Sequence, residues 1–182
     1  MMLKNIYKMN DFVYYTSNKG IHFEIRKANK NDCDMIFGLI QELAEFEKMP
    51  HEVEMTVEKL QSDLKKEAFF CFIVTTKTDE GKIVPAGMNL FFLGYSTWKG
   101  QFIHMEDLYI RPNYRRSGLG EFLIKHLVNY ALLKNIKRIE WAVLEWNINA
   151  INLYKKIGAV DMHEKEQWVT YRLSGEQLKA LV

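Results

Sequence analysis

The sequence predicts an α/β protein in which a central mixed, mostly antiparallel sheet is flanked by helices. Residues 69–111 hold three apolar segments separated by turn signals at 78–82 and 96–100, which is typical of an antiparallel meander. The C-terminal half alternates strand-like and helical patterns, and such an order requires crossover connections and at least one parallel strand pair. With 182 residues, of which 48% are hydrophobic, the chain is long enough to bury one full core.

The first 20 residues are polar and aromatic and show no clear hydrophobic period. We therefore expect residues 1–20 to form an appendage outside the main fold, and residues 21–182 to form a single domain. The stretch contains Lys4, Lys8 and Asp11 and no continuous apolar run, so it does not predict a signal peptide.

Residues 21–68 predict one strand followed by two helices. Residues 22–28 alternate apolar and polar side chains, as a half-buried strand does. Residues 29–32 offer N-caps for a helix, and Thr56 can cap a second, shorter one. The apolar stripe of the first helix ends on Glu47, which is either part of a solvated last turn or part of a site.

Helical and strand-like patterns alternate after the meander. In chain order we expect a helix from Gly118, a strand over residues 136–144, a helix capped by Asn147 or Asn149, and a last strand over residues 166–173. Gly158 would end the second of these helices, as glycine commonly does just past a helix. A short helix is expected to follow the last strand.

Composition excludes several classes of protein. The net charge is +2 and no run of Lys or Arg exceeds two residues, so the basic footprint of a nucleic-acid binder is missing. No apolar run approaches the roughly 20 residues of a membrane span. Cys33 and Cys71 are expected to be core thiols, which favours a reducing, cytoplasmic setting. The five histidines are scattered without helical ligand spacing, so no metal site is expected.

The segment Glu106–Glu121, EDLYIRPNYRRSGLGE, predicts a site for phosphate groups. A strand stopped by Pro112 leads into a basic, glycine-containing turn and then into an amphipathic helix. Unpaired backbone N–H groups and the helix dipole favour negative charge at such a helix start. Gly118 and Gly120 allow the backbone to approach a ligand closely. The turn matches neither the P-loop nor the three-glycine dinucleotide signature.

Two adjacent carboxylates, Glu106 and Asp107, interrupt a strand whose neighbouring residues are apolar on both faces. Because side chains alternate along a strand, the two are expected to point to opposite sides of the sheet. Buried carboxylates are costly unless they are paired, bound by a ligand or placed at a cleft. An ion pair with Arg26 or Arg138 is therefore the alternative to a functional site.

Tyr154 lies within one turn of Ile151 and Ile157, on the expected core-facing side of its helix. It is either a core tyrosine with a satisfied hydroxyl or a functional group. No Gly-x-Ser-x-Gly elbow is present, so serine hydrolase chemistry has no support.

The motif Arg-x-x-Gly-x-Gly over residues 115–120 resembles the acetyl-CoA pyrophosphate loop of the GNAT N-acetyltransferases. The preceding Leu-Tyr-Ile-Arg-Pro, the later Asn147 and the run Tyr-Lys-Lys-Ile-Gly-Ala from Tyr154 fit the same family. The resemblance covers residues 23–173. It implies the GNAT acyl-CoA N-acyltransferase fold, in which a parallel strand pair splays apart.

Four further segments resemble the diamine acetyltransferase branch: Glu106-Asp107, residues 95–100, residues 142–147 and residues 166–168. That branch includes spermidine/spermine N-acetyltransferase and thialysine N-acetyltransferase. Ser-Thr-Trp at 96–98 is more similar to the thialysine type, because the polyamine type has an acidic residue and a proline before that tryptophan. The resemblance thus favours thialysine as substrate, with polyamines such as spermidine as the alternative, and it implies a homodimer.

The resemblance also assigns roles to residues. The arm and pyrophosphate of acetyl-CoA would be held by Leu108, Tyr109, Ile110, Arg115, Arg116, Ser117, Gly118, Leu119, Gly120 and Glu121. The far side of the cofactor would contact Asn147, Ile148, Asn149, Ala150 and Tyr154. The amine pocket would be lined by Phe46, Glu47, Glu106, Asp107, Glu166 and Trp168.

Two residues depart from the family pattern. Arg116 stands where close relatives carry glycine, and its backbone contact to the cofactor is expected to survive if its φ is negative. Its side chain would then add a phosphate contact. Phe46 stands where tyrosine is frequent, so a hydroxyl contact to the substrate is missing.

The residue types suit direct acetyl transfer. A primary amine with a pKa near 10 is mostly protonated at pH 7, and Glu106, directly or through a water, can accept its proton. A strand N–H can stabilise the tetrahedral oxyanion, and Tyr154 can protonate the departing thiolate. No nucleophilic residue is required, so Cys71 is not expected to carry the acetyl group.

Two other functions remain open from the sequence. A CoA-binding sensor module without turnover is compatible with the phosphate loop, although binding requires neither Glu106 nor Tyr154. Acetylation of protein N-termini or lysines is the other, although several carboxylates around the pocket suit a compact cation better than a peptide backbone.

Overall fold

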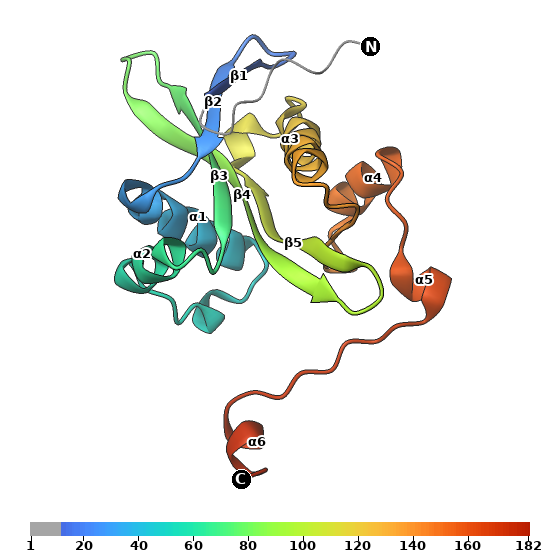
Figure 1. Ribbon diagram of the computed structural model, residues 1–182. Coiled ribbons are helices and arrows are strands. Elements are labelled where there is room, and N and C mark those ends of the chain that lie inside the picture. Colours follow the sequence, from blue (N-terminus) through green and yellow to red (C-terminus); the bar gives the residue numbers. More distant parts are fainter. Residues whose placement is uncertain (1–11) are drawn as a thin grey trace. The chain divides into compact units, whose positions relative to one another are not determined.

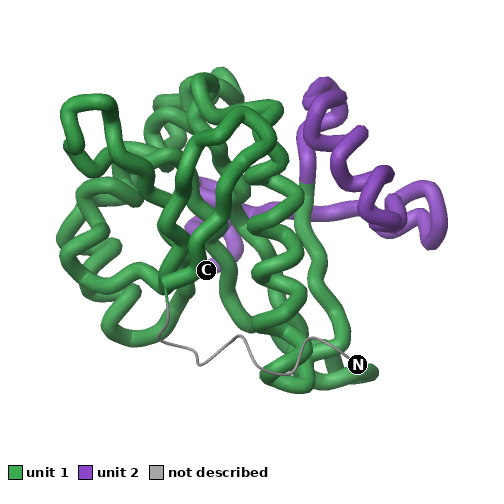
Figure 2. Tube along the Cα trace, turned by 90° about the horizontal axis from the view of Figure 1, so that it is seen from above, with its two compact units in different colours: residues 1–142 green, residues 143–182 purple. Residues whose placement is uncertain are grey.

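The computed structural model describes residues 12–182, and the chain divides into two compact units (Figures 1 and 2). Unit 1 spans residues 1–142 and carries the whole sheet, whereas unit 2 spans residues 143–182 and contains three short helices.

Unit 1 is built on six strands in sequential order. They are β1 (Val13–Thr16), β2 (His22–Lys27), β3 (Phe70–Lys77), β4 (Ile83–Ser96), β5 (Gly100–Ile110) and β6 (Ile139–Glu140). Neighbouring strands are antiparallel except β5 and β6, which are parallel. The expectation of a mixed, mostly antiparallel sheet with a parallel pair is therefore confirmed.

The sequence-based expectation of an N-terminal appendage is wrong for residues 13–16. They form β1 and pair antiparallel with β2, so they belong to the sheet, while residues 1–11 lie outside the described residues. The segment Val-Tyr-Tyr-Thr is β-branched and aromatic and therefore suits a strand. Ser17 closes the connection, because its backbone carbonyl accepts a hydrogen bond from the N–H of Gly20 at 3.0 Å.

Three α-helices cover the two faces of this sheet (Figure 1). They are α1 (Cys33–Phe46), α2 (Val57–Lys65) and α3 (Leu119–Leu133), joined in part by the 3-10 turns η1 (Lys30–Asp32), η2 (Pro50–Glu52) and η3 (Pro112–Tyr114). Thr56 caps α2 as expected, because its side chain accepts from the N–H of Lys59. Asn29 caps η1, where its side chain accepts from the N–H of Asn31, whereas the N-cap of α1, Asp32, forms no side-chain cap bond.

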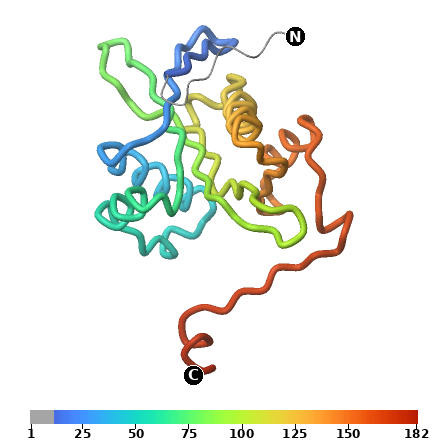
Figure 3. The backbone as a smooth tube through the Cα atoms, in the orientation of Figure 1, coloured from blue at the N-terminus to red at the C-terminus, as the bar shows by residue number. Residues whose placement is uncertain are grey.

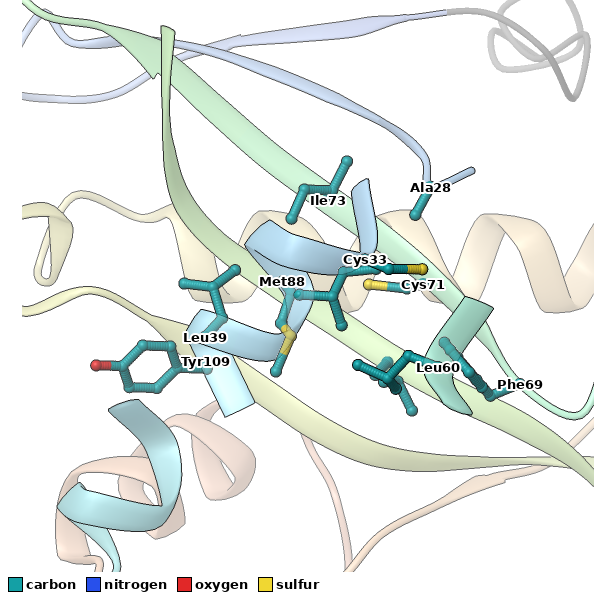
Figure 4. Packing of buried hydrophobic residues seen from close by; sticks show 11 residues of the cluster. Ala28, Cys33, Leu39, Leu60, Phe69, Cys71, Ile73, Met88 and Tyr109 are labelled. Carbon is teal, nitrogen blue, oxygen red and sulfur yellow. The ribbon is translucent and has the colours of Figure 1, made fainter. Parts of the chain in front are cut away.

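The face under α1 and α2 is filled by one hydrophobic cluster (Figure 4). It is made of Ala28, Cys33, Ile36, Leu39, Leu60, Phe69, Cys71, Ile73, Met88, Leu90 and Tyr109. On the opposite face Phe72 and Phe91 contact Tyr130 of α3, with ring centroids 5.9 and 5.2 Å apart. Cys71 and Phe72 are adjacent in β3 and face opposite layers, as strand alternation requires.

Unit 2 contains α4 (Ile148–Lys156), α5 (Met162–Glu166) and α6 (Glu176–Lys179). Asn147 is the N-cap of α4, and its side-chain oxygen accepts a hydrogen bond from the N–H of Ala150 at 3.3 Å. Gly158, with φ of 83°, follows the helix in the left-handed region, as expected.

Two expected strands differ from the structure. Residues 166–173 form no strand, because Glu166 is the last residue of α5 and Gln167 leaves that helix with φ of 60°. Extended segments are stabilised by a neighbouring strand, and the described residues offer none to this segment. The strand expected over 136–144 is reduced to β6, because β5 pairs with it at two positions only.

Candidate active site

A register shift in β5 determines how the paired carboxylates are presented. Leu90 of β4 pairs with Asp107, whereas the next residue, Phe91, pairs with Met105. One step in β4 thus corresponds to two in β5, and Glu106 is the extra residue of a β-bulge.

The bulge places both carboxylates on the side of the sheet that α1 covers, so the expectation that they point to opposite sides is wrong. Asp107 pairs with Leu90, which belongs to the cluster under α1. Glu106 shares a face with His104, whose Nε2 lies 3.4 Å from its Oε2. The extra residue breaks the two-residue alternation, which is the reason for the error.

Glu47 supplies a third carboxylate close to this pair. Burial, together with the negative charges of Glu106 and Glu47, raises the pKa of Asp107 to about 7. Burial also raises the pKa of Glu47. Among residues 12–182 neither the Glu47 nor the Asp107 carboxylate forms a hydrogen bond or an ion pair with a cation. Within the described residues these two carboxylates are therefore not neutralised by a direct cationic partner.

The two arginines that offered a structural alternative are engaged elsewhere. Arg26 forms two hydrogen bonds of 2.7 Å with Asp32, and Nε of Arg138 lies 3.4 Å from Glu140. The interpretation of Glu106 and Asp107 as halves of structural ion pairs with these arginines is therefore wrong.

The glycine-containing turn connects β5 to α3. Gly118 is the N-cap of α3 and has φ of 83°, so the turn requires a residue that tolerates the left-handed region. Leu119, Gly120 and Glu121 form the first turn of α3, where backbone N–H groups point out of the helix start. The turn thus has the geometry that favours phosphate binding.

Arg116 does not meet the condition expected from the sequence. Its φ is 57°, not negative, and a left-handed conformation costs a side-chain-bearing residue roughly 1–2 kcal/mol. Glycine avoids this cost, which explains why glycine is suited to this position. In this chain the loop instead carries a strained residue directly before Ser117 and Gly118.

Arg115 directs its side chain away from the helix start. Its Nε donates to the carbonyl oxygen of Ile110 at 2.8 Å, and its guanidinium lies 4.9 Å from the ring centroid of Phe46 and 5.6 Å from that of Tyr109. The side chain thereby links the end of β5 to the end of α1. Its backbone N–H donates to the carbonyl of Pro112 at 3.2 Å, so neither this N–H nor the side chain points to a phosphate in this conformation.

β5 has an open edge beside this turn. β6 pairs with Ile103 and His104 only, so Leu108, Tyr109 and Ile110 pair with β4 on one side and with no described strand on the other. Free N–H and C=O groups at a strand edge can pair with an extended amide-bearing chain. Together with the turn, this edge fits a ligand such as acetyl-CoA, which has an amide-containing arm and a pyrophosphate.

Unit 2 carries the remaining candidate residues. Tyr154 lies in α4, and burial raises the pKa of its phenol to about 12. Ile148, Asn149 and Ala150 form the first turn of the same helix, so the expected cofactor contacts are gathered at its start. Glu166 ends α5 and Trp168 follows it closely, and the indole Nε1 of Trp168 donates to the Glu166 carboxylate at 3.0 Å.

Sequence reasoning missed three residues beside the candidate site. Arg111 links β5 to α1, since its Nε donates to Oε2 of Glu42 at 3.0 Å. Tyr15 and Lys19 contact the glycine-containing turn from the N-terminal strand pair. The β-branched and aromatic run at 13–16 was a usable signal for a strand, but nothing in the sequence identified its partners.

The two cysteines are buried and free. Burial raises the pKa of the Cys71 thiol well above its usual value, so its thiolate form is suppressed. Within residues 12–182 no group of three His, Cys, Asp or Glu side chains could hold a metal ion. The helices of this range are also too short or too polar to cross a membrane.

The fold and the turn match a known family of acetyl-transferring enzymes. Residues 36–159 match the model of the Acetyltransferase (GNAT) family. The chain belongs to this family and is an N-acetyltransferase, and the GNAT fold expected from the resemblance is confirmed.

Three relatives are similar to this chain over most of its length. A thialysine N-epsilon-acetyltransferase of Caenorhabditis elegans is 47% identical over 154 residues, which cover 85% of this chain and 93% of the relative. The protein of the same description from Mus musculus is 39% identical, covering 86% and 95%. A human spermidine/spermine N(1)-acetyltransferase-like protein 1 is 31% identical, covering 86% of this chain and 23% of the relative.

The fold is also shared with solved structures of low identity. An aminoglycoside N-acetyltransferase in complex with CoA superimposes with a TM-score of 0.64 at 17% identity, covering 86% of this chain and 97% of that chain. At this identity the likeness concerns the fold alone.

Proposed function

We propose that this protein transfers the acetyl group of acetyl-CoA directly to a primary amine of a small, diamine-like substrate, with thialysine favoured. The thialysine N-epsilon-acetyltransferases of two animals align with most of this chain at 47% and 39% identity. The open edge of β5 and the helix start at Gly118 fit the arm and the pyrophosphate of acetyl-CoA.

The observation that carries the proposal is the carboxylate group at the bulge. Glu47, Glu106 and Asp107 lie close enough for the first two to raise the pKa of the third. A cationic substrate supplies the positive charge that this group lacks, and attraction between opposite charges is strengthened where water is excluded. A site of this kind favours a compact ammonium over the backbone of a peptide.

The bulge also offers proton acceptors for the bound amine. The amine loses its proton before attack, and an acceptor works best when its pKa lies near the working pH. Glu106 is the acceptor predicted from the sequence, and its exposed side chain can act through a water. Asp107, with a pKa of about 7, is better matched to neutral pH and is proposed to share this role.

Tyr154 is proposed to donate a proton, or a hydrogen bond, to the sulfur of the departing thiolate. A phenol with a pKa of about 12 stays protonated across the neutral range, so the donor form is always present. No residue is proposed to carry the acetyl group, which is consistent with the buried and poorly ionised Cys71.

Thiol release from acetyl-CoA, measured for a panel of amines, tests the proposal. The panel contains thialysine, lysine, ornithine, putrescine, spermidine and a short lysine peptide, compared by kcat/KM. Thialysine is expected to be preferred over spermidine and over the peptide. Preference for spermidine would replace the thialysine assignment by the polyamine alternative, which the human relative represents. Binding of acetyl-CoA without thiol release from any amine would support the sensor module instead.

Three further features are part of the proposal. Residues 13–182, with β1 included, are proposed to act as one acetyltransferase domain, because β1 belongs to the sheet and the family model runs across both units. A homodimer is proposed from the resemblance to the branch and from the exposed apolar side chains of Trp168, Val169 and Tyr171. Light scattering during gel filtration tests that state. A cytoplasmic location is proposed from the two free, buried cysteines.

A further inference from the structure

The N-terminal hairpin, which consists of β1, β2 and the turn between them, contacts the glycine-containing turn before α3 (Figure 3). The hydroxyl of Tyr15 donates to the backbone carbonyl of Ser117 at 2.9 Å. Nζ of Lys19 donates to the backbone carbonyl of Arg115 at 3.0 Å. Tyr15 and Lys19, which lie about 100 residues earlier in the sequence, thus hold the backbone carbonyls of two residues of this turn.

Packing reinforces the contact. The ring of Tyr15 stacks on that of Phe122 in the first turns of α3, with centroids 4.4 Å apart. A Cβ atom at Gly118 would collide with the Tyr15 hydroxyl. Gly118 therefore serves two needs at once, its left-handed backbone and the close approach of Tyr15.

The planarity of the peptide bond gives these contacts a consequence for binding. In a trans peptide the C=O of one residue and the N–H of the next point in opposite directions. A carbonyl of Ser117 held by Tyr15 directs the N–H of Gly118 away from the hairpin. The carbonyl of Arg115, held by Lys19, does the same for the N–H of Arg116. Both N–H groups belong to the expected pyrophosphate loop, and the N–H of Arg116 is aimed by the peptide plane that Lys19 holds, although the φ of Arg116 is positive.

We propose that the N-terminal hairpin positions this loop for acetyl-CoA, with Tyr15 and Lys19 as positioning residues. The hairpin fixes the direction of two backbone N–H groups before the ligand arrives, so less ordering is left to binding. The strained φ of Arg116 gives the loop a reason to need such support. The inference rests on the proposed use of acetyl-CoA.

Two single substitutions test the proposal in the full chain, Tyr15→Phe and Lys19→Met. Tyr14→Phe is the matched control, because Tyr14 lies on the same strand, is 72% exposed and points to the other side of the sheet. The Kd for acetyl-CoA is measured by calorimetry, and KM and kcat are measured by thiol release. Each test variant is expected to raise Kd and KM for acetyl-CoA about 3- to 10-fold, the usual effect of one lost hydrogen bond, with kcat within about two-fold.

A truncated donor separates positioning from general weakening. S-acetylpantetheine lacks the pyrophosphate, so its KM is expected to be the same in the wild type, the test variants and the control. Equal Kd values for acetyl-CoA in Tyr15→Phe and Tyr14→Phe would overturn the inference. So would an equal loss with S-acetylpantetheine, because that loss would not depend on the pyrophosphate. A wild-type chain that fails to bind acetyl-CoA would contradict the proposed function itself, which is a distinct outcome.

Discussion

At the scale of single residues, Asp107 holds a carboxylate where burial and two neighbouring carboxylates all oppose its charge. Its pKa rises from 3.8 to about 7 in the folded state. Between these values the folded state binds more protons than the unfolded state. The contribution of this group to stability is therefore present at low pH and is lost as the pH rises through 7.

Asp107→Asn is expected to stabilise the fold at pH 8 and to leave it nearly unchanged at pH 4. The gain at pH 8 is at most about 4 kcal/mol, which corresponds to three pKa units. Urea unfolding at the two pH values measures the difference. Glu106→Gln is the comparison variant: Glu106 is exposed, so its removal relieves only its repulsion of Asp107, and a smaller gain is expected. Equal stability of Asp107→Asn and the wild type at pH 8 would mean that burial and charge repulsion do not destabilise the ionised Asp107 carboxylate.

Tyr154 is another residue whose pKa differs from that of a free side chain, because its phenol is buried. Tyr154→Phe is expected to lower kcat about 100-fold, the low end for a lost general acid, with an unchanged Kd for acetyl-CoA. Because the pKa of this phenol is about 12, its ionisation is not expected to lower kcat between pH 7 and pH 10. Full turnover by Tyr154→Phe would remove this residue from the mechanism.

At the scale of elements, the turn between β5 and α3 combines a functional geometry with a local cost. Arg116→Gly removes the cost of a left-handed side-chain-bearing residue, which is roughly 1–2 kcal/mol. The greater flexibility of glycine in the unfolded chain offsets about 0.5–1 kcal/mol of this gain in stability. The net expectation is a gain of up to about 1 kcal/mol in the free energy of unfolding. Chemical denaturation measures it.

Lys134→Gly is the matched substitution for Arg116→Gly. Lys134 has φ of −88°, so glycine relieves no strain there and a loss of about 0.5–1 kcal/mol is expected. If both substitutions destabilised the fold equally, the left-handed backbone of Arg116 would not be costly.

Elements whose pattern is local were predicted well from the sequence. The caps at Asn29 and Thr56, the three strands of the meander and the glycine-containing turn each depend on residues near one another in the chain. The bulge at Glu106 was not predicted, because register depends on the partner strand. A strand over 166–173 was predicted wrongly for the related reason that an extended segment becomes a strand only beside another one.

The candidate site was likewise predicted only where its features are local in the sequence. Glu106 and Asp107 were found as an unusual pair in an apolar strand, yet their common face follows from the bulge and could not be deduced from alternation. Tyr15 and Lys19 were placed in an appendage, because a short strand shows no clear period and its contacts with residues 115–117 are distant in sequence. Residue types that can take part in catalysis can be identified from the sequence. The contacts that position them depend on how distant segments pack together.

At the scale of the whole molecule, unit 1 carries Glu106, Asp107, the open edge of β5 and the glycine-containing turn, and unit 2 carries Tyr154 on α4. Binding of acetyl-CoA and recognition of the amine are thus assigned to different groups. Acetyl-CoA binding and amine recognition are therefore expected to be separable by substitution. A variant that lacks the carboxylates should keep acetyl-CoA and lose the amine.

The double variant Glu106→Gln/Asp107→Asn tests this separation most directly. Thiol release with thialysine and the Kd for acetyl-CoA are measured side by side on the variant and the wild type. In the double variant kcat/KM for thialysine is expected to fall at least about 100-fold, because the cation site and both proton acceptors are lost. The Kd for acetyl-CoA is expected to stay within about two-fold of the wild-type value. Full turnover with thialysine in the double variant would contradict the assignment of the bulge carboxylates to amine acetylation.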